Sequence, residues 1–357
     1  MMMVGPSTAA GSFAMPTAGM AGMPSAGSGM PMAMAGRMMG AAGRSGAGGA
    51  AGGAAGGTAG AGGSAGSGSA GLGAGAGGGG TGGAAGDSAG AGGAAGDSAG
   101  AGGAGGCCAD GDCLCHGPVP MQLSASRGPF DVDSYSISEG TVYYPTDAAP
   151  PFAAVAICGG LLNTGPEMES WGPFYASYGI VTVITWTGAS DQPSTRARAL
   201  LGAIAALKEE NTKSGSPLSG KLAGRYGTSG YSMGGGGTTI AASDDATLKT
   251  SVGLAAYGGT GSRVEVATLL LCGSSDGTAP CSMSRGDYTQ MPESTPKMLM
   301  QISGATHFSW FGPGDAGRGT SGQYALAFQK VFLEGDERWK PLLLQEPSTA
   351  MVTTNIE

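Results

Sequence analysis

The composition of this chain changes abruptly near residue 106, and this break limits where a fold can form. Residues 1–106 are almost entirely Gly, Ala, Ser, Met, Thr and Pro, and a ten-residue unit, GGAAGDSAGA, occurs unchanged at 82–91 and 92–101. Such small side chains bury too little apolar surface to offset the entropy lost on ordering. We therefore expect a disordered Gly/Ala/Met-rich segment over 1–106. A β-helix or silk-like stack is the alternative, but aromatic and β-branched residues are nearly absent there.

The rest of the chain has the composition and length of one globular domain. We expect a Cys-rich segment over 107–135 and an α/β domain over 136–357. The net charge is −8 and no basic stripe occurs, so nucleic acid is not an expected partner. No apolar run is long enough to span a membrane. The first residues lack the basic start and continuous apolar core of a signal peptide, so a misassigned start, a truncated sequence or a cytoplasmic location would each fit.

Four of the seven cysteines gather in the Cys-rich segment, directly before His116. They are Cys107, Cys108, Cys113 and Cys115. A metal site and a pair of disulfides are both conceivable, but the spacing lacks the paired Cys-x-x-Cys knuckles of zinc sites, which favours disulfides. Further along, Cys158 is expected to be a buried apolar residue. Cys272 and Cys281 could form a pair.

Strand and helix signals alternate through the domain. Continuous apolar runs such as FAAVAIC are typical of strands buried on both faces, and an amphipathic helix begins at Pro193. Strands are expected at 136–145, 152–158, 180–186, 224–230, 250–257, 266–273 and 297–304. Helices are expected at 170–179, at 193–213, from about 232, and at 323–335. The alternation predicts a mostly parallel sheet covered by helices on both faces.

The pattern G-x-S-x-G occurs four times, so context must separate a functional serine from the rest. The four serines are Ser64, Ser88, Ser98 and Ser232. The first three have no strand before them and no helix after them. Ser232 follows an expected strand and opens a helix, which is the context of a nucleophile elbow. Gly230 and Gly234 would let the chain pass close to its neighbours in that sharp turn, and Gly235 to Gly237 would allow close packing of the helix.

A serine nucleophile needs a base, and the chain has two histidines. His116 lies beside the cysteine cluster, whereas His307 follows the expected strand 297–304. Asp276 directly follows strand 266–273 and could orient that imidazole. The order Ser232, Asp276, His307 is the order found in α/β-hydrolases. Two further acids in expected loops, Asp287 and Asp315, stay open as alternatives.

The tetrahedral intermediate of acyl transfer carries an oxyanion that two backbone N–H groups should hold. One is expected from Met233, which follows the serine. The other is expected from Leu161, in the loop GGLLNTG at 159–165 that follows an expected strand.

Four motifs resemble bacterial cutinases and PET hydrolases, the polyesterase-lipase-cutinase group of α/β-hydrolases. They are GYSMGGGGTT (230–239), SDQPSTRARAL (190–200), SGATHFS (303–309) and QYALAFQKVFLEGDERW (323–339). The resemblance covers roughly 140–343. It implies an α/β-hydrolase fold, with Ser232 as nucleophile, Asp276 as acid and His307 as base, and with Met233 and Leu161 as oxyanion donors. It also implies a secreted ester hydrolase that needs no cofactor. We further expect a monomer that is secreted or at the cell surface, with no metal site.

The chain departs from the group around the expected substrate cleft. The group usually has an aromatic residue where Leu161 stands, and a Trp-bearing loop where this chain has Tyr257 as the nearest aromatic. Trp186, Trp310 and Phe308 are the candidates to supply additional substrate-binding surface, although ordinary packing explains the two tryptophans equally well. Because an aromatic polyester needs a flat aromatic clamp, these departures argue against PET as the preferred substrate.

The sequence therefore predicts a serine carboxylic-ester hydrolase acting through an acyl-enzyme. Its expected substrates are short- to medium-chain esters, with polyesters, PET included, as further candidates. Two alternatives remain: a lipase or general carboxylesterase without polymer activity, and a surface-displayed binding module with a vestigial hydrolase domain.

Overall fold

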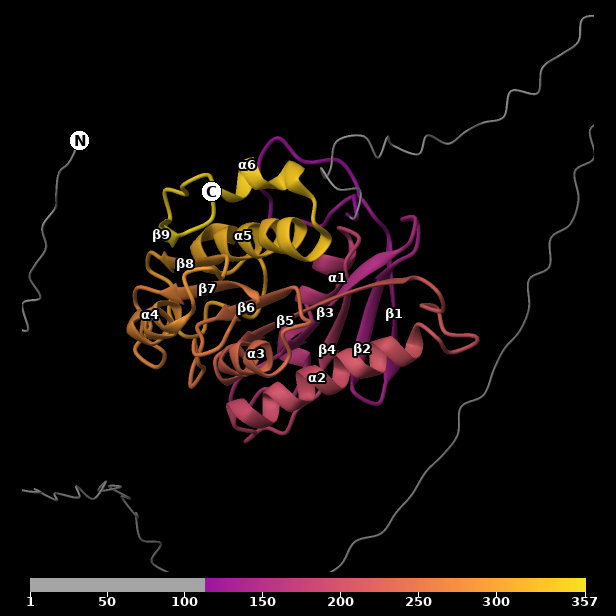
Figure 1. Ribbon diagram of the computed structural model, residues 1–357, viewed down its shortest axis with the longest axis horizontal. Coiled ribbons are helices and arrows are strands. Elements are labelled where there is room, and N and C mark those ends of the chain that lie inside the picture. Colours follow the sequence, from indigo (N-terminus) through magenta and orange to yellow (C-terminus); the bar gives the residue numbers. More distant parts are fainter. Residues whose placement is uncertain (1–112) are drawn as a thin grey trace, which may run out of the picture. The chain divides into compact units, whose positions relative to one another are not determined.

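A nine-stranded sheet organises residues 113–357, the part of the chain that the computed structural model describes (Figure 1). In spatial order the strands are β1 (Val132–Ile137), β2 (Gly140–Pro145), β4 (Val181–Thr185), β3 (Phe152–Cys158), β5 (Leu222–Tyr231), β6 (Thr250–Leu254), β7 (Ala267–Gly273), β8 (Lys297–Ile302) and β9 (Ala350–Thr354). The strands from β4 to β8 pair in parallel, while β1, β2 and β9 add antiparallel edges. This is the α/β-hydrolase arrangement expected from the sequence.

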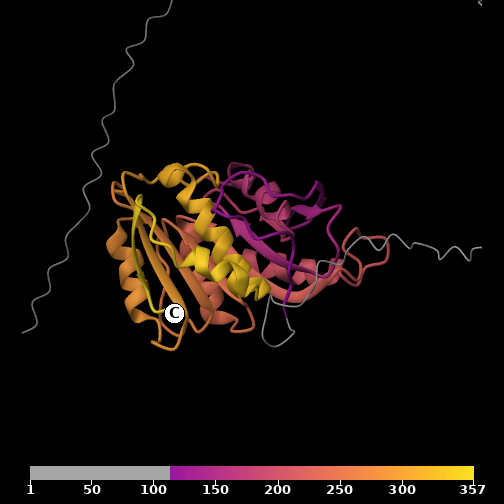
Figure 2. The same ribbon diagram turned by 90° about the horizontal axis from the view of Figure 1, so that it is seen from above.

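Helices cover both faces of the sheet and create two cores (Figures 1 and 2). The helices are α1 (Trp171–Ala176), α2 (Pro193–Glu210), α3 (Met233–Asp244), α4 (Cys281–Gln290), α5 (Thr320–Phe328) and α6 (Lys340–Leu343). On one face, α1, α5 and α6 enclose an aromatic-rich core that contains Trp171 and Phe328. On the other face, α2 and α3 enclose a second core that contains Leu200 and Ala241, with α4 contributing Tyr288 at its margin. Burial of both faces explains why β3 is apolar along its whole length and why every residue of β4 and β7 is buried, threonines included.

Most of the expected strands and helices are confirmed, with five differences. Residues 136–145 do not form one strand: β1 and β2 are an antiparallel hairpin that pairs Ile137 with Gly140. The helix from Thr320 continues as a π-helix over Gln329–Glu334. Three elements were not expected from the sequence, namely α4, the short helix α6 and the edge strand β9. Helix α4 contains Asp287, which we expected in a loop.

The two described cysteines of the Cys-rich segment follow the disulfide interpretation. Cys113 and Cys115 are each disulfide-bonded, and Cys272 pairs with Cys281. Cys158 is free and buried, as expected. Cys107 and Cys108 lie outside the described residues, as does the whole segment 1–106, so its expected disorder and the domain boundaries stay predictions.

The segment that follows the cysteines is held against the last long helix by buried polar groups. His116 Nδ1 lies 2.9 Å from a carboxylate oxygen of Glu334, and its Nε2 lies 3.1 Å from the Ala149 carbonyl oxygen. Lys330 forms an ion pair of 2.7 Å with the same carboxylate group. Because a buried charge without its partner is strongly unfavourable, this cluster fixes the start of the described chain onto the domain. Within residues 113–357, no helix combines the length and apolar character needed to cross a membrane.

Candidate active site

Ser232 occupies a strained turn between β5 and α3. Its φ of 55° and ψ of −118° lie in a region that residues with a side chain rarely adopt. Its N–H donates to the Leu254 carbonyl oxygen, which ties the turn to β6. A Cβ atom at Gly230 would lie 2.3 Å from the Gly234 carbonyl oxygen, and one at Gly234 would lie 2.4 Å from the Gly159 carbonyl oxygen. The crowding expected around this serine is therefore confirmed.

Three polar side chains from separate loops meet in a continuous hydrogen-bonded chain. Ser232 Oγ lies 2.9 Å from His307 Nε2, and His307 Nδ1 lies 2.8 Å from Asp276 Oδ2. A carboxylate only accepts, so Nδ1 carries the proton and Nε2 is left free to accept the serine hydroxyl proton. All three residues are at least nine-tenths buried. The structure therefore brings together the nucleophile, base and acid predicted from the sequence.

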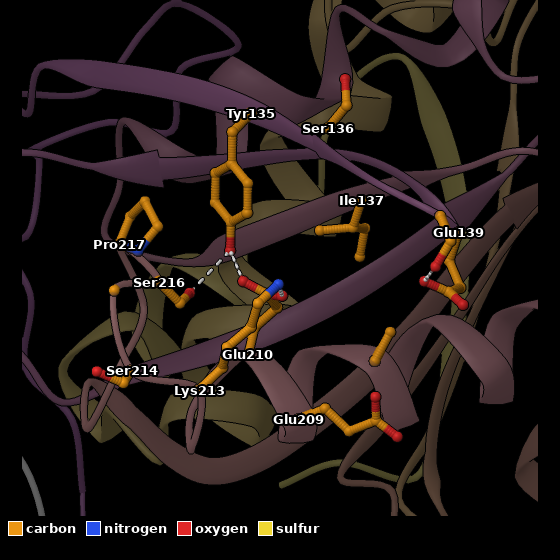
Figure 3. A pocket seen from close by; sticks show the side chains of 13 residues that line it. Tyr135, Ser136, Ile137, Glu139, Glu209, Glu210, Lys213, Ser214, Ser216 and Pro217 are labelled. Carbon is orange, nitrogen blue, oxygen red and sulfur yellow. Dashed lines mark hydrogen bonds and ion pairs between the residues drawn. The ribbon is translucent and has the colours of Figure 1, made fainter.

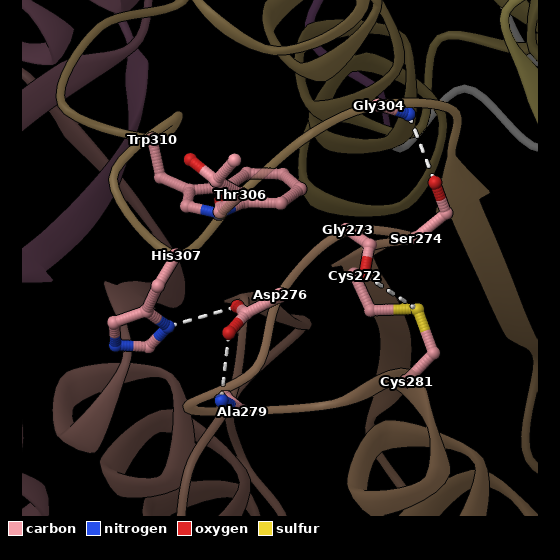
Figure 4. The surroundings of a disulfide bond; sticks show 10 residues. All are labelled: Cys272, Gly273, Ser274, Asp276, Ala279, Cys281, Gly304, Thr306, His307 and Trp310. Atoms are coloured by element: carbon pink, nitrogen blue, oxygen red, sulfur yellow. Dashed lines mark hydrogen bonds and ion pairs between the residues drawn. A yellow bond between two sulfur atoms is a disulfide. The ribbon is translucent and has the colours of Figure 1, made fainter.

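The loop that holds Asp276 is itself tightly organised (Figure 4). Asp276 Oδ1 accepts hydrogen bonds of 2.8 Å from the N–H groups of Thr278 and Ala279. The Cys272–Cys281 disulfide closes the loop at the points where β7 ends and α4 begins. Two backbone donors and the imidazole of His307 therefore hold the Asp276 carboxylate in one orientation.

Neither alternative acid contacts His307 in the described part of the chain. Asp315 instead accepts a hydrogen bond of 2.6 Å from the Gly312 N–H, within the loop that precedes α5. Asp287 lies on α4, and this helix forms one side of a separate hollow. Of the three candidate acids, Asp276 is thus the one hydrogen-bonded to His307.

Trp310, a candidate substrate contact in the sequence, does not line the hollow that opens beside Ser232. Its side chain is fully buried in the aromatic-rich core. The indole N–H donates to the Thr306 carbonyl oxygen at 2.9 Å, and the Trp310 carbonyl oxygen accepts from the Trp171 indole at 3.1 Å. This tryptophan therefore fixes the loop that carries His307.

A hollow of about 330 Å³ opens directly beside Ser232. Its lining residues are Leu161, Leu162, Tyr231, Ser232, Met233, Tyr257, Thr278, His307 and Phe308. Four of the residues singled out as oxyanion donors or substrate contacts are thus present, namely Leu161, Met233, Tyr257 and Phe308. Trp186 is 47% exposed but lies outside this lining, where its ring packs near Gly165.

Three lining residues were not predicted, although two of them carried a signal. Tyr231 directly precedes the nucleophile, and Thr278 lies two positions after the acid. The Tyr231 ring packs against both His307 and Phe311, with centroids 5.2 Å apart in each pair. Leu162 offers no such signal, and its positive φ of 66° turns it outward beside Leu161.

Tyr257 is joined to the nucleophile through the backbone. Its N–H donates to the Ser232 carbonyl oxygen at 2.9 Å. A Cβ atom at Gly236 would lie 2.1 Å from the Tyr257 carbonyl oxygen, so α3 and the Tyr257 loop touch along their main chains. The third glycine of the GGGG run is therefore required by this contact.

Arg196 organises the loop that carries Leu161 and was not predicted to do so. Its guanidinium is buried at the start of α2, where it donates to five oxygens. These acceptors are the carbonyl oxygens of Gly159, Asn163, Gly188 and Asp191 and the hydroxyl of Thr187. A positive charge in the first turn of a helix opposes the helix dipole, and this was the available signal. Burial lowers the pKa of Arg196.

A larger hollow, of about 680 Å³, lies between β1 and the end of α2 and includes none of the three catalytic candidates (Figure 3). There the Tyr135 hydroxyl donates to Glu210 at 3.2 Å, and Lys213 pairs with Glu210 at 2.7 Å. These polar groups are paired with one another. The size of a hollow therefore does not by itself identify the active site.

An elbow serine, an aspartate and a histidine joined in this way at the carboxyl ends of parallel strands define the class of α/β-hydrolases. Within this class the chain belongs to the PET hydrolase-like family, whose model matches residues 109–357. It is 33% identical over 250 residues to the bis(hydroxyethyl) terephthalate hydrolase of Streptomyces coelicolor, covering 66% of this chain and 78% of that protein.

Two cutinases show the same degree of similarity. Cutinase est1 of Thermobifida alba is 33% identical over 252 residues, covering 66% of this chain and 82% of that protein. A cutinase of Thermobifida fusca is 32% identical over 246 residues, covering 65% and 79%. The family resemblance read from the motifs is confirmed.

Proposed function

We propose that this chain hydrolyses carboxylic esters in the manner of a cutinase, with Ser232, His307 and Asp276 as its catalytic residues. The observation that carries the proposal is the hydrogen-bonded chain from Asp276 through His307 to Ser232. A buried, correctly oriented imidazole is what a serine hydroxyl needs to become a nucleophile at neutral pH. The names of the relatives, cutinases and a terephthalate-ester hydrolase, support the same chemistry.

The reaction would proceed in two halves. His307 Nε2 takes the hydroxyl proton while Ser232 Oγ bonds to the ester carbonyl carbon, and the carbonyl oxygen becomes an oxyanion. The imidazolium then protonates the leaving alkoxide oxygen as the ester C–O bond breaks, leaving an acyl-enzyme. Water attacks that acyl group with His307 again as base, and the released acid restores Ser232. Asp276 stabilises the imidazolium in both halves.

Two backbone N–H groups are proposed to stabilise the oxyanion. Met233 is the first residue of α3, where an N–H has no carbonyl partner within the helix and lies at the positive end of the helix dipole. Leu161 belongs to the loop that passes over the nucleophile, since a Cβ atom at Gly160 would lie 2.6 Å from Ser232 Cβ. Both residues line the hollow beside Ser232. Their N–H groups can hold the developing charge without reorganisation.

The shape of the hollow supports short- to medium-chain acyl groups as substrates. It is small, and its rim carries exposed apolar side chains, with Leu161 49% and Phe308 72% exposed. An exposed apolar rim suits contact with a solid or aggregated substrate. We therefore propose simple esters and polyesters as substrates, with Tyr257 and Phe308 as the aromatic contacts.

Replacing Ser232 by Ala tests the mechanism directly. We expect hydrolysis of a nitrophenyl butyrate ester to be lost, and labelling of the intact protein by a fluorophosphonate to disappear with it. Full residual turnover in Ser232→Ala would refute the assignment. Absence of labelling in well-folded wild-type protein would instead favour a binding module. Acid released from a polyester film, measured against tributyrin hydrolysis, separates a polyester hydrolase from a general esterase or lipase.

We further propose that the protein works outside the cytoplasm. Cys113, Cys115, Cys272 and Cys281 are all disulfide-bonded, and such bonds persist mainly in oxidising compartments. Activity that stays in the cell fraction of a producing strain would count against this. That the enzyme acts as a monomer and takes no nucleic acid partner remains a prediction.

A further inference from the structure

Met233 lines the hollow beside Ser232 and carries a sulfur that oxidants attack. The residue directly follows the nucleophile, begins α3 and is partly exposed. A thioether takes up an oxygen atom from a peroxide that can reach it, and the product is methionine sulfoxide. Met233 therefore places an oxidisable group inside the candidate active site.

The other methionines of residues 113–357 differ from Met233 either in exposure or in position. Four of them are at most 2% exposed, so dissolved peroxide does not reach them in the folded protein. They are Met168, Met291, Met298 and Met300. Three others are exposed but do not line the hollow beside Ser232. They are Met121, Met283 and Met351. Within the described residues, Met233 alone combines access to solvent with a place in this hollow.

Oxidation would turn the apolar Met233 side chain into a polar one. A lone pair of the sulfur attacks one oxygen of hydrogen peroxide, and the O–O bond breaks. The second oxygen takes the proton of the first and leaves as water. The sulfur is oxidised by two electrons and the peroxide is reduced. The resulting S–O group is polar, and its oxygen accepts hydrogen bonds.

The new oxygen would lie where the reaction develops negative charge. The N–H groups of Met233 and Leu161 are the proposed oxyanion donors, and both residues line this hollow. A sulfoxide oxygen in the same hollow competes for these donors, and its partial negative charge opposes the oxyanion. It also takes space from an acyl group, because the hollow measures only about 330 Å³.

We propose that Met233 is a redox-sensitive modification site, at which a small peroxide converts the thioether to a sulfoxide and stops ester hydrolysis. This inference rests on the proposed ester hydrolysis. The small volume of the hollow favours hydrogen peroxide over bulky oxidants. The modification is reversible in chemical terms, since sulfoxide reductases return methionine sulfoxide to methionine.

The test treats the full-length protein with excess hydrogen peroxide. Hydrolysis of nitrophenyl butyrate and peptide mapping of sulfoxides are followed together in wild type, Met233→Leu and Met351→Leu, each relative to its own activity before treatment. We expect kcat of wild type to fall about a hundredfold as the Met233 sulfoxide forms, which is the loss expected when one oxyanion donor is blocked. Met351→Leu, which removes an exposed sulfur from β9, should lose activity as wild type does. Met233→Leu has no sulfur at this position and should keep the activity it started with.

A second measurement tests the position of the sulfur without using activity. A fluorophosphonate bonded to Ser232 fills the hollow, so it should slow the oxidation of Met233. The oxidation of Met351, which does not line the hollow, should keep its rate. Peptide mapping of labelled and unlabelled wild type gives both rates.

Three results would overturn the inference. One is an equal fractional loss of activity in wild type and Met233→Leu. Another is full activity in protein whose Met233 is completely converted to the sulfoxide. The third is the same rate of Met233 oxidation with and without the phosphonate on Ser232. If untreated wild type hydrolyses no ester, the proposed function itself fails, and the two failures are therefore distinguishable.

Discussion

Arg196 donates a hydrogen bond of 2.9 Å to the carbonyl oxygen of Gly159, joining the first turn of α2 to the loop beside the nucleophile. Four further bonds from the same guanidinium hold Asn163, Thr187, Gly188 and Asp191. One buried side chain thus sets the shape of the loop that carries Leu161.

Replacing Arg196 by Lys should lower kcat by about ten- to a hundredfold with a smaller change in KM. A lysine has three donors on a compact charge and cannot satisfy five acceptors in a fork-like arrangement, so the Leu161 N–H would move away from the oxyanion. Steady-state kinetics on a nitrophenyl ester measure the effect. Arg198→Lys, at an exposed neighbour on α2, is the matched control. Equal kinetics for the two variants would show that the loop holds its shape without Arg196.

Replacing Asp276 by Asn should reduce kcat by roughly 10³–10⁴-fold while the protein stays folded. The asparagine amide can donate to His307 Nδ1, and this favours the tautomer with the proton on Nε2. A protonated Nε2 can no longer accept the hydroxyl proton of Ser232. Circular dichroism checks that the variant is folded, and steady-state kinetics measure the loss of kcat. Asp315→Asn, at the alternative acid, should remain active. Comparable losses in the two variants would contradict the assignment of Asp276.

Asp287, whose carboxylate has no hydrogen-bond or ion-pair partner within residues 113–357, should make the protein less stable as pH rises through the acidic range. Its pKa moves from 3.8 to about 6 on folding, so between these values the native state binds more protons than the unfolded state. Stability attributable to this group is therefore present at low pH and is lost as pH rises through the folded pKa. We expect Asp287→Asn to gain about 3 kcal/mol relative to wild type between pH 4 and pH 7. Urea unfolding across this range tests it, and a difference that does not vary with pH would contradict it.

Removing the disulfide with Cys272→Ala and Cys281→Ala together should lower the free energy of unfolding by about 2–3 kcal/mol, because a short loop regains freedom in the unfolded chain. Since that loop contains Asp276, kcat should fall more than KM changes. Thermal unfolding of the double variant gives the change in unfolding free energy, and steady-state kinetics give kcat and KM. An unchanged unfolding free energy would show that the two backbone hydrogen bonds to Asp276 suffice.

The sequence predicts that the three catalytic candidates come together because chain order and strand context are local properties, and the structure joins them by hydrogen bonds. Ser232, Asp276 and His307 each follow an apolar strand, and parallel strands bring their carboxyl ends together. The hairpin at 136–145 was missed because Ser138 and Glu139 lack the Asn-Gly or Asp-Gly signature of a tight turn.

Residues whose role depends on burial could not be predicted. Trp310 and Trp186 are the same residue type in similar polar loops, yet one lies in the core and the other is half exposed. In the sequence, Arg196 resembles an ordinary solvated charge on an amphipathic helix. Its burial depends on the loop that carries Leu161, which packs over it in the fold. Asp287 belongs to a helix with a central Gly286 and few apolar residues, so its segment had no clear helical pattern.

The main-chain contact between α3 and the Tyr257 loop makes the position of Ser232 independent of the side chain at residue 257. The bond from the Tyr257 N–H to the Ser232 carbonyl oxygen uses no side-chain atom of residue 257. The ring at that position can therefore be exchanged during evolution or engineering while the nucleophile keeps its place. Substitutions at position 257 can therefore change which substrates are bound while the position of Ser232 stays the same.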